Sequence, residues 1–165
     1  MKTIKRRRKE NKTDYAKRLK MLKSRKARVV VRKTNKYIIA QYVLSPKTQD
    51  KIEIGLSSKN LLNYGWPKEF EGSLKSIPAS YLTGFLIGKK IIDGKKEAPI
   101  IDFGMTRTLH KTKIFAFLKG LVDSGVNIKH DEKTFPEEDR ISGKSLKKDF
   151  SNEFNKIKSN IENGK

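Results

Sequence analysis

The concentration of positive charge at one end of this chain sets the strongest limit on where a folded core can form. Residues 1–36 contain 17 Lys and Arg against two acidic residues, so they carry +15 of the formal net charge of +21. Within them, residues 1–12 have one apolar side chain beyond Met1, that of Ile4. So little apolar surface cannot offset the entropy lost on ordering. We therefore predict a basic arm that is disordered over its first twelve residues.

A short helix is predicted to complete this arm. Thr13 or Asp14 can serve as its N-cap residue, and the helix is expected to stop near Ser24. Three apolar residues recur at helical spacing and form a single stripe: Tyr15, Leu19 and Leu22. Because an apolar stripe normally faces the rest of the fold, we expect the Tyr15 ring to pack in the core, with its hydroxyl still able to reach a phosphate.

From Arg28 onward the apolar side chains alternate with polar ones, which is typical of strands. Three such runs begin at residue 28, at residue 36 and at residue 51. A turn at Thr34 and Asn35 separates the first two, and Pro46 ends the second. The pattern predicts an antiparallel meander of three strands. Alternation along the third strand, residues 51–56, puts three side chains on one face: Ile52, Ile54 and Leu56.

Helical periodicity returns in the middle of the chain. The expected elements are a short helix and loop over 57–76, a helix over 78–92, a buried strand over 98–103, a helix over 114–124 and an extended segment over 126–128. Ser80, Gly84 and Gly88 share one stripe of the first long helix. Small side chains at that spacing predict close contact with the sheet. Gly94 and Gly125 are suited to end the two helices.

The last segment shows a regular apolar stripe. A helix is predicted from about Ser142, and five apolar residues recur along it at steps of three and four: Leu146, Phe150, Phe154, Ile157 and Ile161. The fold class is therefore α/β, with a mixed sheet (an antiparallel meander plus a further strand), packed helices, a basic N-terminal arm and a C-terminal helix. We expect an arm at 1–26, a mixed α/β RNA-binding domain at 27–130 and a C-terminal helical extension at 131–165.

The charge balance points to a nucleic-acid partner. An excess this large repels itself unless a polyanion neutralises it. No run approaches the roughly 18 apolar residues of a spanning helix, and the N-terminus does not look like a signal peptide. The sequence has no cysteine and two histidines, His110 and His130. We therefore expect a cytosolic protein with no membrane partner, no metal site and no cofactor.

The candidate RNA contacts come from the arm, the first hairpin and the loop at 104–113. Lys and Arg neutralise phosphates, Asn and Gln can read base edges, and Tyr can stack on an unpaired base. The loop has hydroxyl groups and precedes a helix N-terminus, which suits phosphate, although it does not match a nucleotide-binding P-loop. The candidates are Arg6, Arg7, Arg8, Lys12, Tyr15, Arg18, Lys23, Arg25, Arg28, Arg32, Asn35, Lys36, Tyr37, Gln41, Thr106, Arg107, Thr108, His110, Lys111 and Lys113.

A nuclease is the competing enzymatic hypothesis. Asp93, Glu97 and Asp102 lie close in sequence around a predicted strand, and a two-metal nuclease needs converging carboxylates. However, Asp93 and Glu97 fall in a glycine turn among lysines, where solvated charge is the simpler interpretation. For Asp102 we predict a structural role, either capping the end of the strand or ordering the following loop through backbone hydrogen bonds. We therefore assign no catalytic residue and predict a protein that is not an enzyme.

Several segments together resemble the family of large-subunit ribosomal protein eighteen, in its archaeal form, whose eukaryotic relative is called protein five. The resemblance covers almost the whole chain, although Thr34 stands where many relatives have Ser. The matching segments are Arg6-Arg7-Arg8, Lys12 to Tyr15, Arg18-Leu19, Arg28 to Lys36, Ala79 to Gly84, Ile101 to Met105, Phe115 to Gly125, and Glu137 to Gly143.

The resemblance implies a ribosomal function. It implies that the chain binds 5S rRNA and helps dock it to 23S-type large-subunit rRNA in the central protuberance. The implied protein partners are ribosomal protein five of the universal naming and other central-protuberance proteins, and the implied location is the large subunit of cytoplasmic ribosomes. A non-ribosomal RNA-binding module is the alternative.

Overall fold

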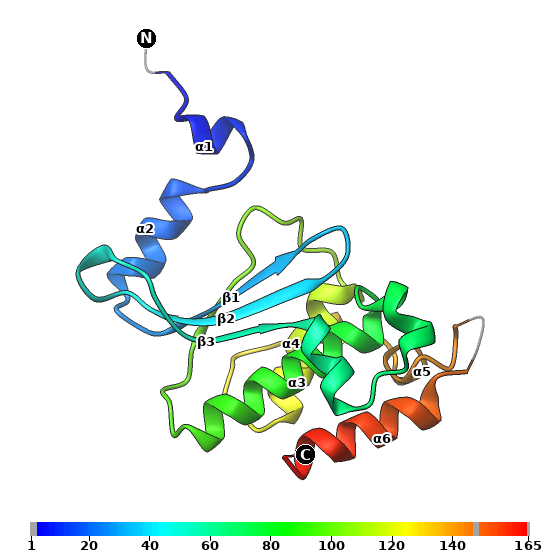
Figure 1. Ribbon diagram of the computed structural model, residues 1–165. Helices are drawn as coiled ribbons and strands as arrows, with labels where there is room; N and C mark the ends of the chain where they lie inside the picture. The colour runs from blue at the N-terminus through cyan, green and yellow to red at the C-terminus, as the bar shows by residue number, and fades with distance from the viewer. Residues whose placement is uncertain (1–2, 147–148, 165) are drawn as a thin grey trace.

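The computed structural model describes residues 3–146 and 149–164, and its centre is a four-stranded mixed sheet (Figure 1). The strand order is β3-β2-β1-β4. β1 pairs antiparallel with β2 and β2 with β3, whereas β4 runs parallel to β1. The strands are β1 (Arg28–Lys33), β2 (Ile38–Leu44), β3 (Lys51–Ser57) and β4 (Ile100–Asp102). The predicted mixed α/β class is therefore confirmed, although the expected strand over 98–103 is shorter and residues 126–128 form no strand.

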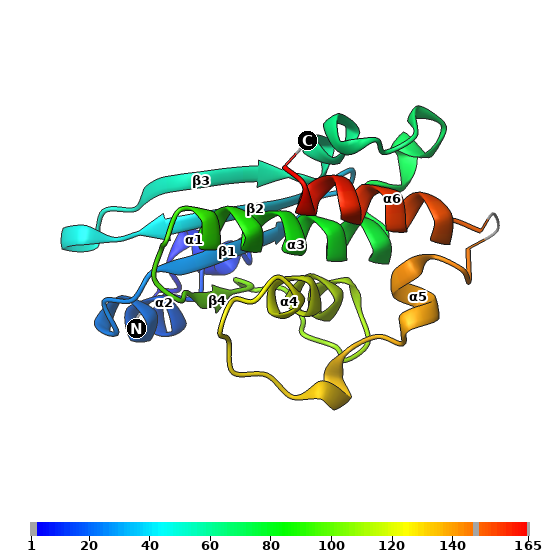
Figure 2. The same ribbon diagram turned by 90° about the horizontal axis from the view of Figure 1, so that it is seen from below.

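The longer helices cover one face of this sheet, and the helices of the arm lie beyond the other (Figures 1 and 2). The α-helices are α1 (Arg6–Lys9), α2 (Tyr15–Lys23), α3 (Ile77–Asp93), α4 (Lys113–Asp123), α5 (Glu138–Ser142) and α6 (Ser151–Glu162). The described residues also form 3-10 segments: η1 (Pro46–Thr48), η2 (Ser58–Tyr64), η3 (Lys68–Ser73) and η4 (Glu132–Thr134). One hydrophobic core joins the sheet to α3, α4, α5 and α6.

The third strand contains an irregularity that alternation did not predict. Tyr42 pairs with Ile54, but the next residue, Val43, pairs with Ile52, so Glu53 is an extra residue in β3. Such a bulge shifts the side-chain alternation by one position. Ile52 is accordingly 52% exposed, and the prediction that it shares a face with Ile54 and Leu56 is wrong.

The small residues of α3 pack against α4, not against the sheet as predicted. A Cβ atom at Gly84 would overlap the backbone carbonyl of Phe117, and one at Gly120 would overlap that of Tyr81. The Ser80 hydroxyl donates to the Lys113 carbonyl at 2.5 Å. Glycine therefore permits a close helix–helix approach that forms the centre of the core.

The C-terminal segment contains two helices, whereas a single helix from Ser142 was predicted. Gly143 ends α5 in the left-handed conformation, with φ of 82°. Leu146 is 41% exposed, while Phe150 and the remaining stripe residues are buried. Phe150 contacts Trp66 with ring centroids 4.6 Å apart. The last helix is therefore part of the main core.

The arm also differs from its prediction. Residues 6–9 form one helical turn, where we expected disorder, although none of its residues is buried. Helix α2 forms as predicted, with the Asp14 side chain accepting from the Lys17 amide. Its apolar stripe does not reach the core, since Tyr15 and Leu19 are 37% and 55% exposed. The Lys5 ammonium lies over the Tyr15 ring, 4.6 Å from its centroid.

Candidate nucleic-acid interface

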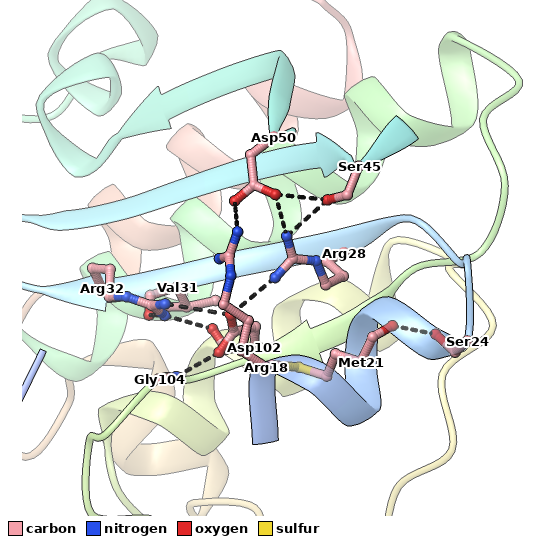
Figure 3. Close-up of polar contacts among 10 residues, drawn as sticks. All are labelled: Arg18, Met21, Ser24, Arg28, Val31, Arg32, Ser45, Asp50, Asp102 and Gly104. Carbon is pink, nitrogen blue, oxygen red and sulfur yellow. Dashed lines mark hydrogen bonds and ion pairs between the residues drawn. The ribbon is translucent and has the colours of Figure 1, made fainter. Parts of the chain in front are cut away.

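A buried arginine lies at the centre of the polar network beneath the arm (Figure 3). Arg28 is 1% exposed, and its Nη2 donates to Asp50 at 2.8 Å and to Ser45 at 2.9 Å. Its Nη1 lies 3.5 Å from the Asp102 carboxylate. Because its charge is neutralised inside the protein, we withdraw Arg28 as a candidate phosphate contact and assign it a structural role.

Asp102 connects this network to the loop at 104–113. Its Oδ1 accepts from the Gly104 amide at 2.7 Å, and its Oδ2 lies 3.3 Å from the Arg32 guanidinium. Arg32 also donates to the Asp102 carbonyl at 2.8 Å and retains an exposed edge, its side chain being 40% exposed. The predicted role of Asp102 in ordering the loop is confirmed.

Asp50 connects the same network to the arm. It accepts from Arg18 of α2 at 3.0 Å and from Arg28 at 2.8 Å. Burial alone would raise the pKa of Asp50, but hydrogen bonds from Ser45 and Arg18 and the charge of Arg28 outweigh that effect and lower it. The carboxylate is therefore ionised at neutral pH and holds α2 to the sheet.

The arm and the loop meet on this side of the sheet. The Arg8 guanidinium contacts the Met105 sulfur at 2.9 Å. A hollow of about 130 Å³ between the two segments, here called the arm hollow, has a strongly basic lining. Its lining residues are Arg7, Lys12, Thr13, Asp14, Lys17, Arg18, Met21, Arg32, Asp102 and Gly104. Four predicted contacts, in the arm and in β1, therefore lie together.

A second basic depression is lined by the loop, the end of β1, α5 and the starts of α3 and α4. This loop groove has a volume of about 430 Å³ and is lined by Lys33, Ile77, Thr106, Arg107, Leu109, Lys111, Thr112, Lys113, Ile114 and Arg140. Lys111 pairs with Glu137 at 3.0 Å. Burial lowers the pKa of Lys113, and the neighbouring charges of Lys33 and Lys75 lower it further. The cations are thus close enough to repel one another.

The remaining candidates are divided between exposed and structural positions. The first hairpin turn is open to solvent, with Asn35 and Lys36 exposed. Tyr37 is half-buried against the core, which favours a structural role for its ring, and Gln41 is half-buried in β2. Lys23 is exposed at the far end of α2.

Three further groups complete the predicted set. Arg6 is exposed and pairs with Glu10 at 3.7 Å. Arg25 lines a different hollow, beside the segment around Pro46. In the loop, Thr108 and His110 are exposed, and the His110 ring packs edge-on against Phe115 with centroids 5.5 Å apart.

The comparisons with known proteins decide the family. A family model for ribosomal large subunit proteins 60S L5 and 50S L18 matches residues 1–99. The chain belongs to this family. A relative from Korarchaeum cryptofilum, named large ribosomal subunit protein uL18, is 43% identical over 86% of this chain and 70% of its own length. Relatives of the same name from Methanothrix thermoacetophila and Methanothermobacter thermautotrophicus are each 39% identical over 86% of this chain, and over 82% and 71% of their own lengths.

Membership in this family decides between a ribosomal protein, a non-ribosomal RNA-binding module and a nuclease. The family consists of structural, non-enzymatic proteins of the large ribosomal subunit, so the chain is a ribosomal protein of the cytoplasm and not an isolated RNA-binding module. The acids of the nuclease hypothesis do not converge either, because Asp93 and Glu97 are exposed while Asp102 is 4% exposed and paired with arginines. None of the helices described has the length and apolar character needed to cross a bilayer.

Sequence reasoning missed several residues of this interface, among them Lys17, which lines the arm hollow. Asp50 was not singled out, although an arginine at the start of an otherwise apolar strand indicates that an acidic partner is needed. Lys33 and Arg140 were not included, yet both line the loop groove. Arg140 belongs to a segment that carries the family resemblance, and that was the available signal.

Proposed function

We propose that this chain binds 5S rRNA and helps dock it to the large-subunit rRNA of the central protuberance. Ribosomal protein five of the universal naming and other proteins of that region are its proposed neighbours. The observation that carries the proposal is that three distant basic segments, the arm, the end of β1 and the loop at 104–113, together line two basic hollows.

The spread of positive charge over two hollows supports a polyanion as the ligand. Arg32 lines the arm hollow, and Lys33, whose side chain leaves β1 on the opposite face, lines the loop groove. A nucleic acid presents phosphates at regular intervals, so it can contact both hollows at once, and each contact releases counterions. Small anions have no comparable reach.

Cations of the arm form exposed ion pairs that RNA phosphates can replace. Arg8 pairs with Asp14 at 3.1 Å, and Lys12 pairs with Glu10 at 2.8 Å. These pairs are exposed, and exposed pairs contribute little stability. Phosphates can therefore replace the carboxylates at small cost in free energy.

A competition titration tests the proposal. Labelled 5S rRNA transcript is titrated with the full-length protein, and unlabelled 5S rRNA or another folded RNA of equal length is added as competitor. We expect 5S rRNA to compete at least tenfold better, since specific binding normally exceeds non-specific binding by well over tenfold. Equal competition by the two RNAs would mean that the protein binds RNA without preference for 5S rRNA, and it would contradict the 5S assignment.

Docking is tested separately by sedimentation. Large subunits depleted of this protein are incubated with it in low and high salt and pelleted. We expect it to remain with the subunit in high salt only when 5S rRNA is present. Retention without 5S rRNA would mean that large-subunit rRNA or protein holds the chain directly.

A further inference from the structure

Four cations of the loop groove form no ion pair with the described residues, although the charge of Arg140 acts on the nearby Glu137 carboxylate. Lys33, Arg107, Lys113 and Arg140 make no ion pair with any acid among residues 3–146 and 149–164, in contrast to Arg8, Lys12 and Arg18 of the arm. The four come from β1, the loop, the start of α4 and α5. A convergence of like charges from four separate elements is unfavourable without an anion between them.

The groove also has an apolar wall. Ile77 and Ile114 line it together with Leu109, which is 49% exposed. Phosphates alone gain nothing from such a wall. An apolar surface beside cations is suited to a group that has both an anionic and a flat apolar part, as a nucleotide has.

The loop is held in place before any ligand arrives. The Lys111 amide donates to the Thr134 carbonyl at 2.9 Å, and the Thr112 hydroxyl donates to the Leu109 carbonyl at 2.7 Å. The Thr112 side chain makes no capping hydrogen bond to α4. The first residues of α4 line the groove, so its positive helix end adds to the cations there.

We propose that the loop groove binds an unpaired segment of RNA, with its phosphates on the four cations and a base against the wall of Ile77 and Leu109. This inference rests on the proposed function and specifies which form of RNA the second hollow takes. Paired RNA is not suited to it, since the base faces of a duplex are stacked and inaccessible. A peptide of acidic residues has the charge but no flat apolar group, and the membership of the chain in a ribosomal family favours RNA.

The test uses the full-length protein and three probes: a single-stranded RNA hexamer, a hexamer with the same backbone but no bases, and a short duplex with an equal number of phosphates. Leu109→Ala removes the apolar wall at an exposed position and keeps the charge. Ile92→Ala is its control, since Ile92 is 42% exposed at the opposite end of α3 from Ile77. Arg140→Gln removes one cation from the groove. Lys90→Gln is its control, since Lys90 is exposed near the C-terminal end of α3, at the opposite end of that helix from the groove residue Ile77.

We expect Leu109→Ala to weaken hexamer binding by about fivefold, the low end of the effect of losing one base contact. Binding of the abasic hexamer and of the duplex should not change. Arg140→Gln should weaken both hexamers and lower the slope of log affinity against log salt by about 0.7. The two control variants should bind as the wild type does.

Two outcomes would overturn the inference. If Leu109→Ala leaves the hexamer unaffected, or weakens the duplex equally, the groove does not hold a base. If a poly-glutamate peptide binds with the same sensitivity to Leu109→Ala and Arg140→Gln, the groove is a protein-binding site. Either result is compatible with tight 5S rRNA binding through the arm, so failure here is distinguishable from failure of the proposed function.

Discussion

At the scale of single residues, one buried charge organises the side of the sheet that carries the arm. The alternation that turns Val29 into the core turns Arg28 to the opposite face, where it meets Asp50 and Asp102. A buried guanidinium needs such partners because an unpaired buried charge is strongly destabilising. Its Nε still has no hydrogen-bond partner among the described residues. The network therefore serves to position the arm and the loop more than to maximise stability.

Asp102→Asn is expected to destabilise the protein by about 1–3 kcal/mol. Removing one partner of a buried ion pair costs about 3–5 kcal/mol, but Arg28 retains Asp50, and the asparagine oxygen can still accept from Gly104. Urea unfolding followed by circular dichroism measures the change. Combining it with Arg28→Met should show non-additivity, since the two side chains interact directly. Additive effects would contradict the pairing.

Asp50 is expected to make stability fall at acid pH. Because its pKa is lowered in the folded protein, its contribution is complete above the ordinary pKa of about 3.9 and is lost as the pH falls through the lowered value. Asp50→Asn lacks this contribution at every pH. The gap in urea midpoint between wild type and variant should therefore narrow from pH 6 to pH 2, and a constant gap would show that the carboxylate charge is irrelevant.

At the scale of elements, the sequence predicted what depends on local periodicity and missed what depends on distant partners. Helices α2, α3 and α4 were placed to within about two residues, because capping residues and apolar spacing define them. The end of α5 at Gly143 was missed because the apolar residues from Leu146 to Ile161 keep helical spacing, although α6 begins only at Ser151. The burial of Arg28 was missed because Asp50 is distant in the chain, and the bulge at Glu53 leaves no sign in an alternating pattern.

The contact of α3 with α4 is expected to tolerate no added side chain. Gly84→Ala places a methyl group on the Phe117 carbonyl, and helix backbones cannot yield as a flexible side chain can. We expect a loss of about 2–3 kcal/mol, at the upper end of overpacking effects. Gly72→Ala is the control, since a Cβ there meets nothing within 4 Å. Equal thermal stability of the two variants would show that the helices can separate without penalty.

At the scale of the whole molecule, some of the basic residues are paired with acids and others are not. Four cations of the arm, Arg6, Arg8, Lys12 and Arg18, pair with Glu10, Asp14 and Asp50. Arg7 and Lys17 of the arm hollow and four cations of the loop groove form no ion pair in the part of the chain described. The folded chain can therefore keep its arm close to the sheet without RNA and still present a strong field at the loop. We therefore expect the affinity for RNA to depend on the positions of the cations in the loop and not on the net charge of the protein alone.

Replacing Arg107, Lys111 and Lys113 together by alanine tests this dependence. Each lost phosphate contact lowers the slope of log affinity against log salt by about 0.7–0.9, so the triple variant should bind 5S rRNA with a slope shallower by up to about 2–3. A matched variant with three exposed lysines replaced elsewhere (Lys59, Lys90 and Lys129) has the same net charge. Because these lysines lie outside both hollows, that control should keep the wild-type slope. If both variants lose slope equally, overall charge accounts for the binding and the loop is only a connection between β4 and α4.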